Sequence, residues 1–406
     1  MKRSCRLRSS ILTKERRGNA LKFAILCEGK FGPLTSKTAN ACIRYSPGRV
    51  AAVIDTTQAG RTAREILGFG GGIPVVCSLD DARRAGATAL LIGIAPQGGQ
   101  LPAEWRVVVV DALRHKMDVW SGLHFFLGTD PEFAALARSS GATIHDLRRP
   151  PPNLPIAGGR VRGIDATVVL AVGTDCNVGK MTTQLQLCSA VRKRGGRVAV
   201  AATGQTGSLV EGWGTSVDAV VADFIAGAAE DLVLRAARDA DIVLVEGQGS
   251  IVHPAYSGVT FGLIHGTLPH GFLLCAQPSR TTIAHNEWVR IPPLPDLIAL
   301  HEAVARPLRP ARVVGVSFNT FDLDDAAARA AITRATAETG LPCTDPVRYD
   351  DTPLVDAIME LHETTRRNDR KTLRIRAGSS AVQAVGSLDG STGIGLPASG
   401  DLAEIT

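Results

Sequence analysis

The stretch VVLAVGTDCNVGKMTT, residues 168–183, decides how this chain folds. Its first five residues are apolar and long enough for a buried strand, and a turn bounded by Gly173 and Gly179 follows them. The next residues, QLQLCSAVR at 184–192, place apolar side chains at helical spacing. The sequence therefore predicts a strand, a tight loop and a helix N-terminus, in that order.

This order of elements is typical of a phosphate-binding loop. Backbone N–H groups and the positive end of the helix dipole point at an anion, glycines let the backbone approach it, and Lys180 adds a charge. Five residues separate Gly173 from Gly179, one more than in the common Walker A pattern, and Met181 stands where that pattern has a Mg²⁺-binding Ser or Thr. The pattern thus predicts phosphate binding more directly than metal-dependent triphosphate chemistry. The predicted cofactor-binding residues of the loop are Gly173, Thr174, Asp175, Cys176, Asn177, Val178, Gly179, Lys180, Met181, Thr182 and Thr183.

Length, charge and cysteine usage narrow the class of protein. A chain of 406 residues exceeds one ordinary core, so we expect two domains and tails. The net charge is +6, and residues 1–19 hold seven Lys or Arg against one Glu, so the whole basic balance belongs to that segment. No basic patch with interleaved aromatic residues follows, which argues against nucleic-acid binding. No apolar run of membrane-spanning length occurs, and the eight scattered cysteines indicate core residues in a reducing cytoplasm, with no metal site.

Short apolar runs alternate with helical stretches in the first 150 residues, which predicts a Rossmann-like parallel sheet with helices on both faces. The first turn of this half lacks GxGxxG, and Asp55 is either a ribose-binding acid or a helix cap. The glycine-containing stretches 68–72 and 95–99 are either ligand loops or ordinary turns. The predicted strands are 22–27, 50–54, 73–77, 89–93, 107–110 and a segment around 118–120.

The second half begins after a proline-rich connector at 148–155 and is predicted to be a doubly wound P-loop domain. Glu246 follows a predicted strand at 241–245, so it occupies a Walker-B-like position beside the phosphate loop. Further strands are expected at 197–202, 271–275 and 312–318, and a helix from about 227 to 238. The predicted organisation is a disordered basic leader (1–21), a Rossmann-like domain (22–150), a linker (151–162), a P-loop domain (163–365) and a disordered tail (366–406).

Several motifs occur together in a fixed order. The second half contains the phosphate loop at 173–183, GQTG at 204–207, DAVVADFIAG at 218–227 and VEGQGSIVHPAYSGVT at 245–260. The first half adds Lys37-Thr38, residues 44–47, Asp55-Thr56, LIGIAP at 91–96 and SGLH at 121–124. With these motifs the chain resembles the bacterial family typified by D-glutamate N-acetyltransferase, long catalogued as proteins of unknown function.

The resemblance implies a Rossmann-like domain joined to a P-loop domain, and transfer of an acetyl group from acetyl-CoA to the amine of D-glutamate. A shorter likeness, through the phosphate loop and Glu246–Gly249, is to the ATP-dependent dethiobiotin synthetase, and it departs at Met181. An ATP- and Mg²⁺-using ligase or kinase, or a nucleotide-binding regulatory protein, therefore stays an alternative. The expected partner is a small molecule, with a homo-oligomer as a further possibility.

Acetyl transfer sets requirements that particular residues could meet. Acetyl-CoA carries a pyrophosphate that Lys180 and the N–H groups of 177–182 could hold without hydrolysing anything. The acceptor amine must be neutral, which calls for a base, and Glu246 and His253 are the candidates, with Lys180 as the third predicted catalytic residue. Glu246 is alternatively a structural or Mg²⁺-related carboxylate, and His253 an ordinary hydrogen-bonded histidine. Backbone groups at 247–249 are candidate oxyanion donors.

The remaining candidates surround the same loop. Cys176, at a helix N-terminus, is either an acyl carrier with a lowered pKa or simply a small loop residue. A dicarboxylate acceptor needs cationic partners, for which Arg280 or Arg290 are candidates unless they are surface arginines. Gln248 is a second predicted substrate-binding residue. Asn319 either reads adenine or caps its strand.

Overall fold

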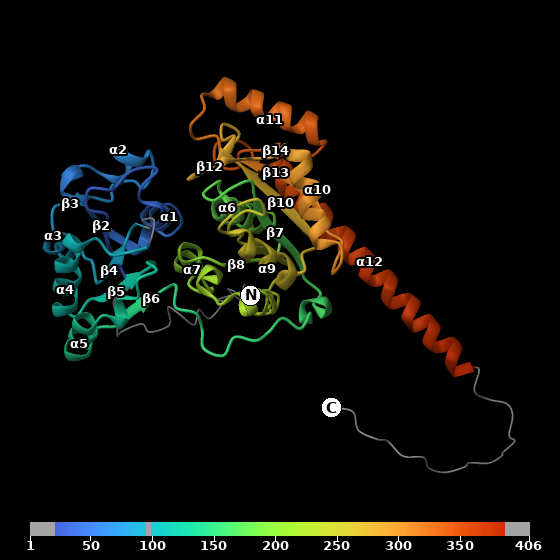
Figure 1. The fold of residues 1–406 in the computed structure, drawn as a ribbon, viewed down its shortest axis with the longest axis horizontal. Helices are drawn as coiled ribbons and strands as arrows, with labels where there is room; N and C mark the ends of the chain where they lie inside the picture. Colours follow the sequence, from blue (N-terminus) through green and yellow to red (C-terminus); the bar gives the residue numbers. More distant parts are fainter. Residues whose placement is uncertain (1–20, 95–98, 386–406) are drawn as a thin grey trace, which may run out of the picture. The chain divides into compact units, whose positions relative to one another are not determined.

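The computed structural model describes residues 21–94 and 99–385. These residues form two six-stranded sheets whose paired strands are all parallel, and each sheet is covered by helices (Figure 1). Both sheets lie in the compact unit that ends at His362. The predicted α/β fold class is therefore confirmed, while residues 1–20 of the basic leader and residues 95–98 of one predicted loop lie outside the described residues.

The first sheet has the strand order β3-β2-β1-β4-β5-β6. Its central strand β1 is buried along its whole length and pairs with β2 and β4, which explains its purely apolar sequence. The strands are β1 (Phe23–Leu26), β2 (Val50–Ile54), β3 (Val75–Val76), β4 (Ala89–Ile92), β5 (Asp118–Ser121) and β6 (Ile144–Asp146).

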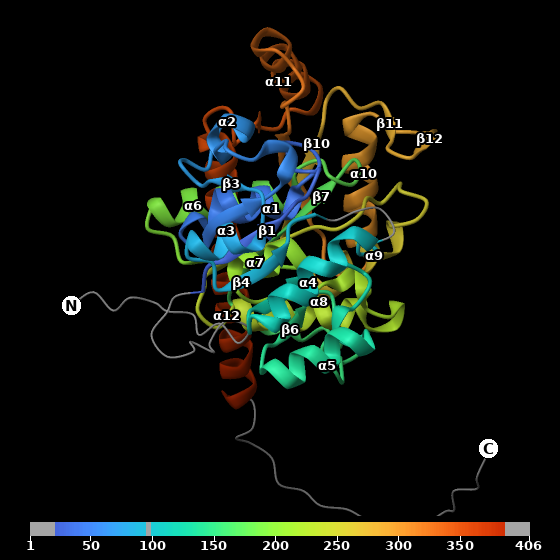
Figure 2. The ribbon, with the colours of Figure 1, turned by 90° about the vertical axis from the view of Figure 1, so that its left-hand side faces the viewer.

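Five α-helices accompany this sheet, and Figure 2 shows them from their own side. The predicted strand at 107–110 is wrong, because these valines belong to α4. Buried Trp105, Val109, Ala112 and Leu113 recur at helical spacing while Val107 is exposed, so packing on the sheet overrides the strand preference of the valine run. The helices are α1 (Lys37–Tyr45), α2 (Ala63–Leu67), α3 (Leu79–Arg84), α4 (Arg106–Arg114) and α5 (Pro131–Ser140).

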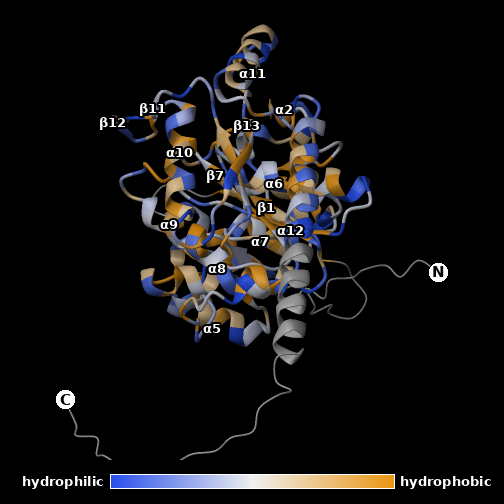
Figure 3. Ribbon diagram, turned by 90° about the vertical axis from the view of Figure 1, so that its right-hand side faces the viewer, coloured by the Kyte–Doolittle hydropathy of each residue, from blue (hydrophilic) through white to orange (hydrophobic). Residues whose placement is uncertain are grey.

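The second sheet has the order β14-β13-β10-β7-β9-β8, with β7 at its centre. All seven residues of β7 are buried, and burying one valine or leucine stabilises a fold by about 1.5–3 kcal/mol. Hydrophobic colour runs along β13 in the same sheet (Figure 3). The strands are β7 (Thr167–Gly173), β8 (Val198–Ala201), β9 (Ile242–Val245), β10 (Gly271–Ala276), β13 (Arg312–Phe318) and β14 (Cys343–Thr344), and a separate hairpin pairs β11 (Thr282–Ile283) with β12 (Asn286–Arg290).

Helices of the second half follow its strands in alternation. Helix α8 begins at Ala222, ahead of the predicted start near Gly227, because Ile225 already belongs to its buried face. The helices are α6 (Lys180–Lys193), α7 (Gln205–Glu211), α8 (Ala222–Ala236), α9 (Ser257–Thr267), α10 (Leu294–Ala305), α11 (Asp325–Thr339) and α12 (Thr352–Val385).

Helix α12 corrects one sequence-based expectation. A disordered tail was expected from residue 366, whereas α12 continues to Val385. Residues 363–377 contain neither Gly nor Pro, so nothing in them stops the helix that starts at Thr352. Residues 386–406 lie outside the described part of the chain. Within the described residues, no helix combines the length and apolarity that crossing a membrane requires.

Contacts join the two domains near the connector. Arg148 forms an ion pair with Asp218, and its Nε donates a hydrogen bond to Gly122 O at 2.7 Å. Ser216 Oγ donates to Leu147 O at 3.0 Å. Because Gly122 follows β5 and Asp218 lies between α7 and α8, the carboxyl edge of the first sheet lies against the segment that follows β8.

Candidate active site at the phosphate loop

The loop between β7 and α6 has the backbone shape of an anion site. Asn177 and Gly179 both adopt positive φ, at 57° and 106°. Gly179 is the N-cap of α6 and provides no side-chain cap, so the N–H groups of the first helical turn stay available for an anion. The positive end of the α6 dipole adds to the attraction for negative charge.

Lys180 is held inside this loop. Its Nζ donates a hydrogen bond to Asp175 O at 2.7 Å, and the side chain is buried. A Cβ at Gly173 would lie 2.9 Å from that Nζ, so the first glycine of the motif makes room for the ammonium. Burial lowers the pKa of Lys180, which a bound phosphate would oppose by favouring the charged form.

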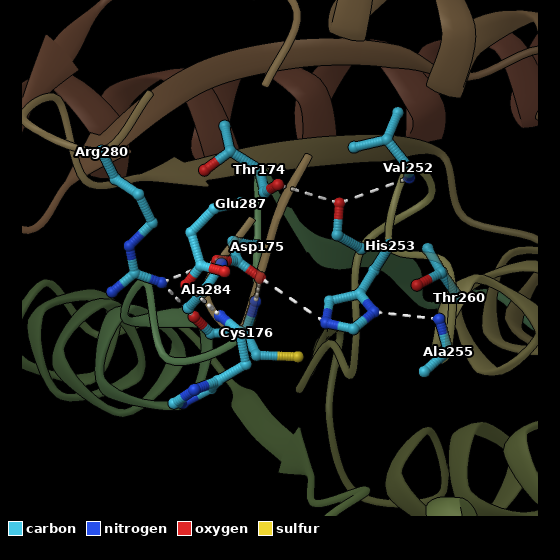
Figure 4. Close-up of polar contacts among 12 residues, drawn as sticks. Thr174, Asp175, Cys176, Val252, His253, Ala255, Thr260, Arg280, Ala284 and Glu287 are labelled. Carbon is cyan, nitrogen blue, oxygen red and sulfur yellow. Dashed lines mark hydrogen bonds and ion pairs between the residues drawn. The ribbon is translucent and has the colours of Figure 1, made fainter. Parts of the chain in front are cut away.

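Asp175 connects the loop to the β11–β12 hairpin (Figure 4). Its carboxylate is fully buried and accepts hydrogen bonds from Arg280 Nη1 at 2.9 Å and from Ala284 N at 2.8 Å. Arg280 also donates to Cys176 O at 2.9 Å and to Gln277 Oε1 at 2.7 Å. The structure therefore places Arg280 at the loop with contacts inside the protein, and substrate binding by Arg280 stays a prediction. The other candidate, Arg290, is exposed at the end of β12.

His253 lies on the opposite side of Asp175. Its Nδ1 accepts a hydrogen bond from Ala255 N at 3.1 Å, and its Nε2 is 4.0 Å from Asp175 Oδ1. Burial lowers the pKa of His253 and so favours the neutral ring, in which the bond from Ala255 leaves the proton on Nε2. In this tautomer His253 presents an N–H donor toward the loop, which suits an oxyanion or a carbonyl better than an amine proton.

Cys176 is half-buried beside these groups. Burial raises the pKa of its thiol, with Lys180 acting in the opposite direction, which favours the small loop residue over the acyl carrier of the two predicted roles. The sulfur, a His253 nitrogen and an Asp175 oxygen lie within 4.8 Å of one another and could hold a metal ion. The second Asp175 oxygen is already occupied by Arg280 and Ala284.

Glu246 follows β9 and binds the segment that begins α7. Its Oε2 accepts hydrogen bonds from Thr203 N and Gly204 N, both at 3.1 Å, and its side chain is 4% exposed. Burial raises the pKa of Glu246, while the charge of Lys37 and the two N–H groups oppose that rise. A Cβ at Gly207 would overlap Glu246 Oε2, so a helical glycine makes this close approach possible. A buried carboxylate with a raised pKa is suited to accept a proton.

The GQG segment after Glu246 is held tightly. A Cβ at Gly247 would overlap Ala171 O, so only glycine fits beside β7. Gln248 Nε2 donates to Thr203 Oγ1 at 3.2 Å, and Gln248 O accepts from Thr260 Oγ1 at 2.9 Å. Gln248 therefore lies next to Glu246, as a substrate-binding candidate should, and its contact with substrate stays a prediction.

The other flank of the loop is formed by the end of β13. Asn319 N donates to Ala276 O at 2.9 Å, and Asn319 Cβ would lie 3.7 Å from a Cβ at Gly179. The half-buried side chain is thus adjacent to the loop, consistent with either predicted role. Thr183 Oγ1 lies 2.8 Å from Ser317 Oγ, so the Thr183 hydroxyl is hydrogen-bonded within the protein.

Met181 takes part in packing between the domains. Its side chain is 8% exposed and belongs to one apolar cluster with Leu185 of α6 and Ala41 of α1. The position that offers a hydroxyl to Mg²⁺ in Walker A loops therefore supports the contact with the first domain.

Lys37 is a residue of the site that the sequence alone does not predict. Lys37 Nζ donates a hydrogen bond to Asn177 Oδ1 at 3.2 Å, across the domain boundary. The only available signal was its place in the Lys37-Thr38 motif of the family resemblance, since a lysine at a helix start is otherwise commonplace.

Asp55 makes its hydrogen bonds within the first domain. This carboxylate is fully buried and accepts hydrogen bonds from Phe31 N at 2.8 Å, Thr57 N at 3.0 Å and Thr57 Oγ1 at 2.6 Å. Of the two predicted roles, the structure shows the helix cap.

Comparisons with known proteins agree with this architecture. Residues 56–150 match the DUF1611 N-terminal Rossmann-like domain, and residues 155–355 match the DUF1611 C-terminal P-loop domain, both described as domains of unknown function. A D-glutamate N-acetyltransferase of Tritonibacter scottomollicae is 42% identical over 69% of this chain and 84% of its own length. The enzyme of the same name from a Pseudoalteromonas species is 36% identical over 67% and 81%. A crystal structure of a DUF1611 family protein from Anabaena variabilis, 42% identical, superposes with a TM-score of 0.80 over 84% of this chain and 100% of that one.

Proposed function

The chain belongs to the DUF1611 family, and we propose that it is an N-acetyltransferase that moves the acetyl group of acetyl-CoA to the amine of D-glutamate. The observation that carries the proposal is the pairing of an open phosphate loop with Glu246, a buried carboxylate of raised pKa on the neighbouring strand. The names of two relatives supply the reaction class and the acceptor.

The proposed donor fits the loop chemically. The N–H groups at the start of α6 and Lys180 would hold the pyrophosphate of acetyl-CoA, and Asn319, next to Gly179, is the proposed contact for the adenine. No phosphoryl group is transferred in this reaction, so the only proposed role of the loop is to bind the donor.

The proposed transfer is a direct attack. The neutral amine of the acceptor forms a C–N bond to the thioester carbonyl carbon, and the C–S bond then breaks. Glu246 takes the proton that the amine loses, and the CoA thiolate leaves and is protonated. The Nε2–H of His253 and the N–H groups of 247–249 would stabilise the oxyanion. Gln248 and the cationic Arg280 are the two proposed contacts for the acceptor.

A thiol-release assay tests this proposal. Purified protein with acetyl-CoA should release free CoA thiol when D-glutamate is added, and mass spectrometry should find N-acetyl-D-glutamate. L-Glutamate, D-aspartate and D-glutamine serve as matched acceptors that vary the stereocentre, length and charge. Turnover with another amine and none with D-glutamate would reject the acceptor, and no thiol release with any amine would reject the reaction.

One alternative keeps a specific observation in its favour. The loop spacing and the Asn319 position also suit an ATP-dependent ligase or kinase, whereas the thioether of Met181 does not suit its Mg²⁺. Acceptor-dependent ADP release that requires Mg²⁺ would establish this alternative.

A further inference from the structure

Lys37 brings a positive charge to the phosphate loop from the other domain, in addition to Lys180 and to Arg280, which is paired with Asp175. It is the first residue of α1, its side chain is exposed, and its Nζ lies 3.2 Å from Asn177 Oδ1. Asn177 sits in the middle of the loop with positive φ, next to the residues that face an anion. The ammonium is therefore at the mouth of the loop, whereas Lys180 lies buried within it.

The charge of Lys37 is felt by groups on several sides of the loop. It opposes the rise in the pKa of Glu246, contributes to the lowered pKa of Lys180, and acts against the raised pKa of the Cys176 thiol. Together with the hydrogen bond to Asn177, these effects indicate that the charge of Lys37 can act on a ligand bound at the loop.

Helix α1 is fixed to the second domain by the same face that carries Lys37. Thr38 Oγ1 lies 3.3 Å from Thr206 Oγ1 of α7, and Ala41 packs in one apolar cluster with Met181. Arg49 Nη1, beyond α1, donates to Leu209 O at 3.4 Å. Lys37, Thr38 and Ala41 occupy neighbouring positions on one helix face, so this packing holds the lysine at the loop.

The loop itself lacks the usual means of adding a second cation. A diphosphate carries at least two negative charges. A Walker A loop balances them with its lysine and with a Mg²⁺ ion bound by the hydroxyl of the residue after that lysine. Here the next residue is the buried thioether of Met181, and Thr183 Oγ1 is occupied by Ser317. A second cation supplied by a side chain would fill this role.

We propose that Lys37 is the second cation of the anion site, so that a ligand diphosphate binds between two lysines from two domains without requiring Mg²⁺. The inference deepens the proposed function, because acetyl-CoA is the diphosphate ligand in question. It also makes α1 a binding element.

Calorimetric titration of the full chain with CoA, ADP and adenosine tests the inference. Lys37→Met should weaken CoA and ADP about tenfold or more, since one charged phosphate contact is worth on the order of 1.4 kcal/mol. Adenosine, which has no phosphate, should bind the variant and the wild type equally. Lys37→Arg should keep most of the affinity. Lys30→Met, also an exposed lysine of the first domain, is the matched control and should change nothing.

The outcomes separate this inference from the proposed function. Equal affinity of Lys37→Met and wild type for ADP and CoA overturns the inference, as does a tenfold loss of wild-type affinity when EDTA removes Mg²⁺. Binding of ADP without binding of CoA rejects acetyl-CoA as donor while the ADP titrations still decide the role of Lys37. If the wild type binds neither, the anion site and the inference are both rejected. A thermal melt of Lys37→Met, expected to match wild type, excludes misfolding as the cause of a loss.

Discussion

The turn after β1 and the turn after β7 occupy equivalent places in two similar sheets, and neither of the helices that follow them has a side-chain cap, yet the two turns use their loop N–H groups differently. In the first turn, Asp55 accepts the N–H of Phe31 and Ser36 Oγ accepts that of Gly32. In the second turn, no side chain among the described residues caps the start of α6, and Lys180 donates a hydrogen bond to Asp175 O inside the loop. The two turns thus differ in the buried group beside them, which is a hydrogen-bond acceptor, Asp55, in the first and a cation, Lys180, in the second.

Removing the proposed base is expected to have the largest effect. Glu246→Gln keeps an oxygen for Thr203 N and Gly204 N but cannot take a proton, so kcat should fall about 10²- to 10⁴-fold. The matched variant in the first turn, Glu28→Gln, alters a carboxylate that accepts Thr56 N and should leave kcat unchanged.

The pH profile sharpens this prediction. A base works when deprotonated, so wild-type kcat/KM should fall as the pH drops through the Glu246 pKa, which burial places above the ordinary glutamate value. The Glu246→Gln variant should lose this acid limb. An identical acid limb in both proteins would mean that another group is the base.

Removing the loop charge should have the next largest effect. Lys180→Met keeps the length of a buried side chain but removes the ammonium, and CoA affinity should fall about 100-fold, which corresponds to about 2.7 kcal/mol. Lys30→Met places the same change in the first turn and should leave the affinity unchanged. Calorimetry measures both variants, and CoA binding that survives Lys180→Met would show that the donor binds elsewhere.

A substitution of Asp55, beside the turn after β1, should lower the stability of the protein and leave its activity almost unchanged. Asp55→Asn weakens a buried acceptor of three hydrogen bonds, so the free energy of unfolding should fall by about 1–3 kcal/mol while kcat stays within twofold. Urea unfolding and the thiol-release assay measure the two quantities. A large loss of kcat in folded Asp55→Asn would mean that the first turn takes part in the reaction.

The smallest effect is expected at Cys176. Burial raises the pKa of its thiol, which disfavours an acyl carrier, so Cys176→Ser should change kcat less than about twofold. Rapid-quench mass spectrometry should find no acetylated enzyme. An acetyl group on Cys176, together with inactive Cys176→Ser, would replace direct attack with a two-step transfer.

The sequence predicts the architecture well because both sheets are built from short apolar runs at regular intervals. The loop between β7 and α6 and the carboxylate after β9 were placed correctly because each follows directly from a strand end. The prediction of a strand from the valines at 107–110 was wrong because strand preference depends on packing. The helical spacing of the buried residues Trp105, Val109 and Leu113 was the better signal.

Details of the site that depend on distant residues could not be predicted. Nothing in the local sequence shows that Asp175 pairs with Arg280, or that Ala255 N fixes the tautomer of His253. The approach of Lys37 to Asn177 joins residues 140 positions apart, and only the folded chain brings them together.

The apolar cluster that includes both Met181 and Ala41 of α1 has a consequence for how this protein can be divided. If the chain were cut in the connector and its halves were purified separately, the P-loop half would expose part of this apolar cluster near its phosphate loop. It would also lack the ammonium group of Lys37. Binding of acetyl-CoA would then depend on association of the two halves, and mixing them would restore binding only in proportion to the fraction that associates.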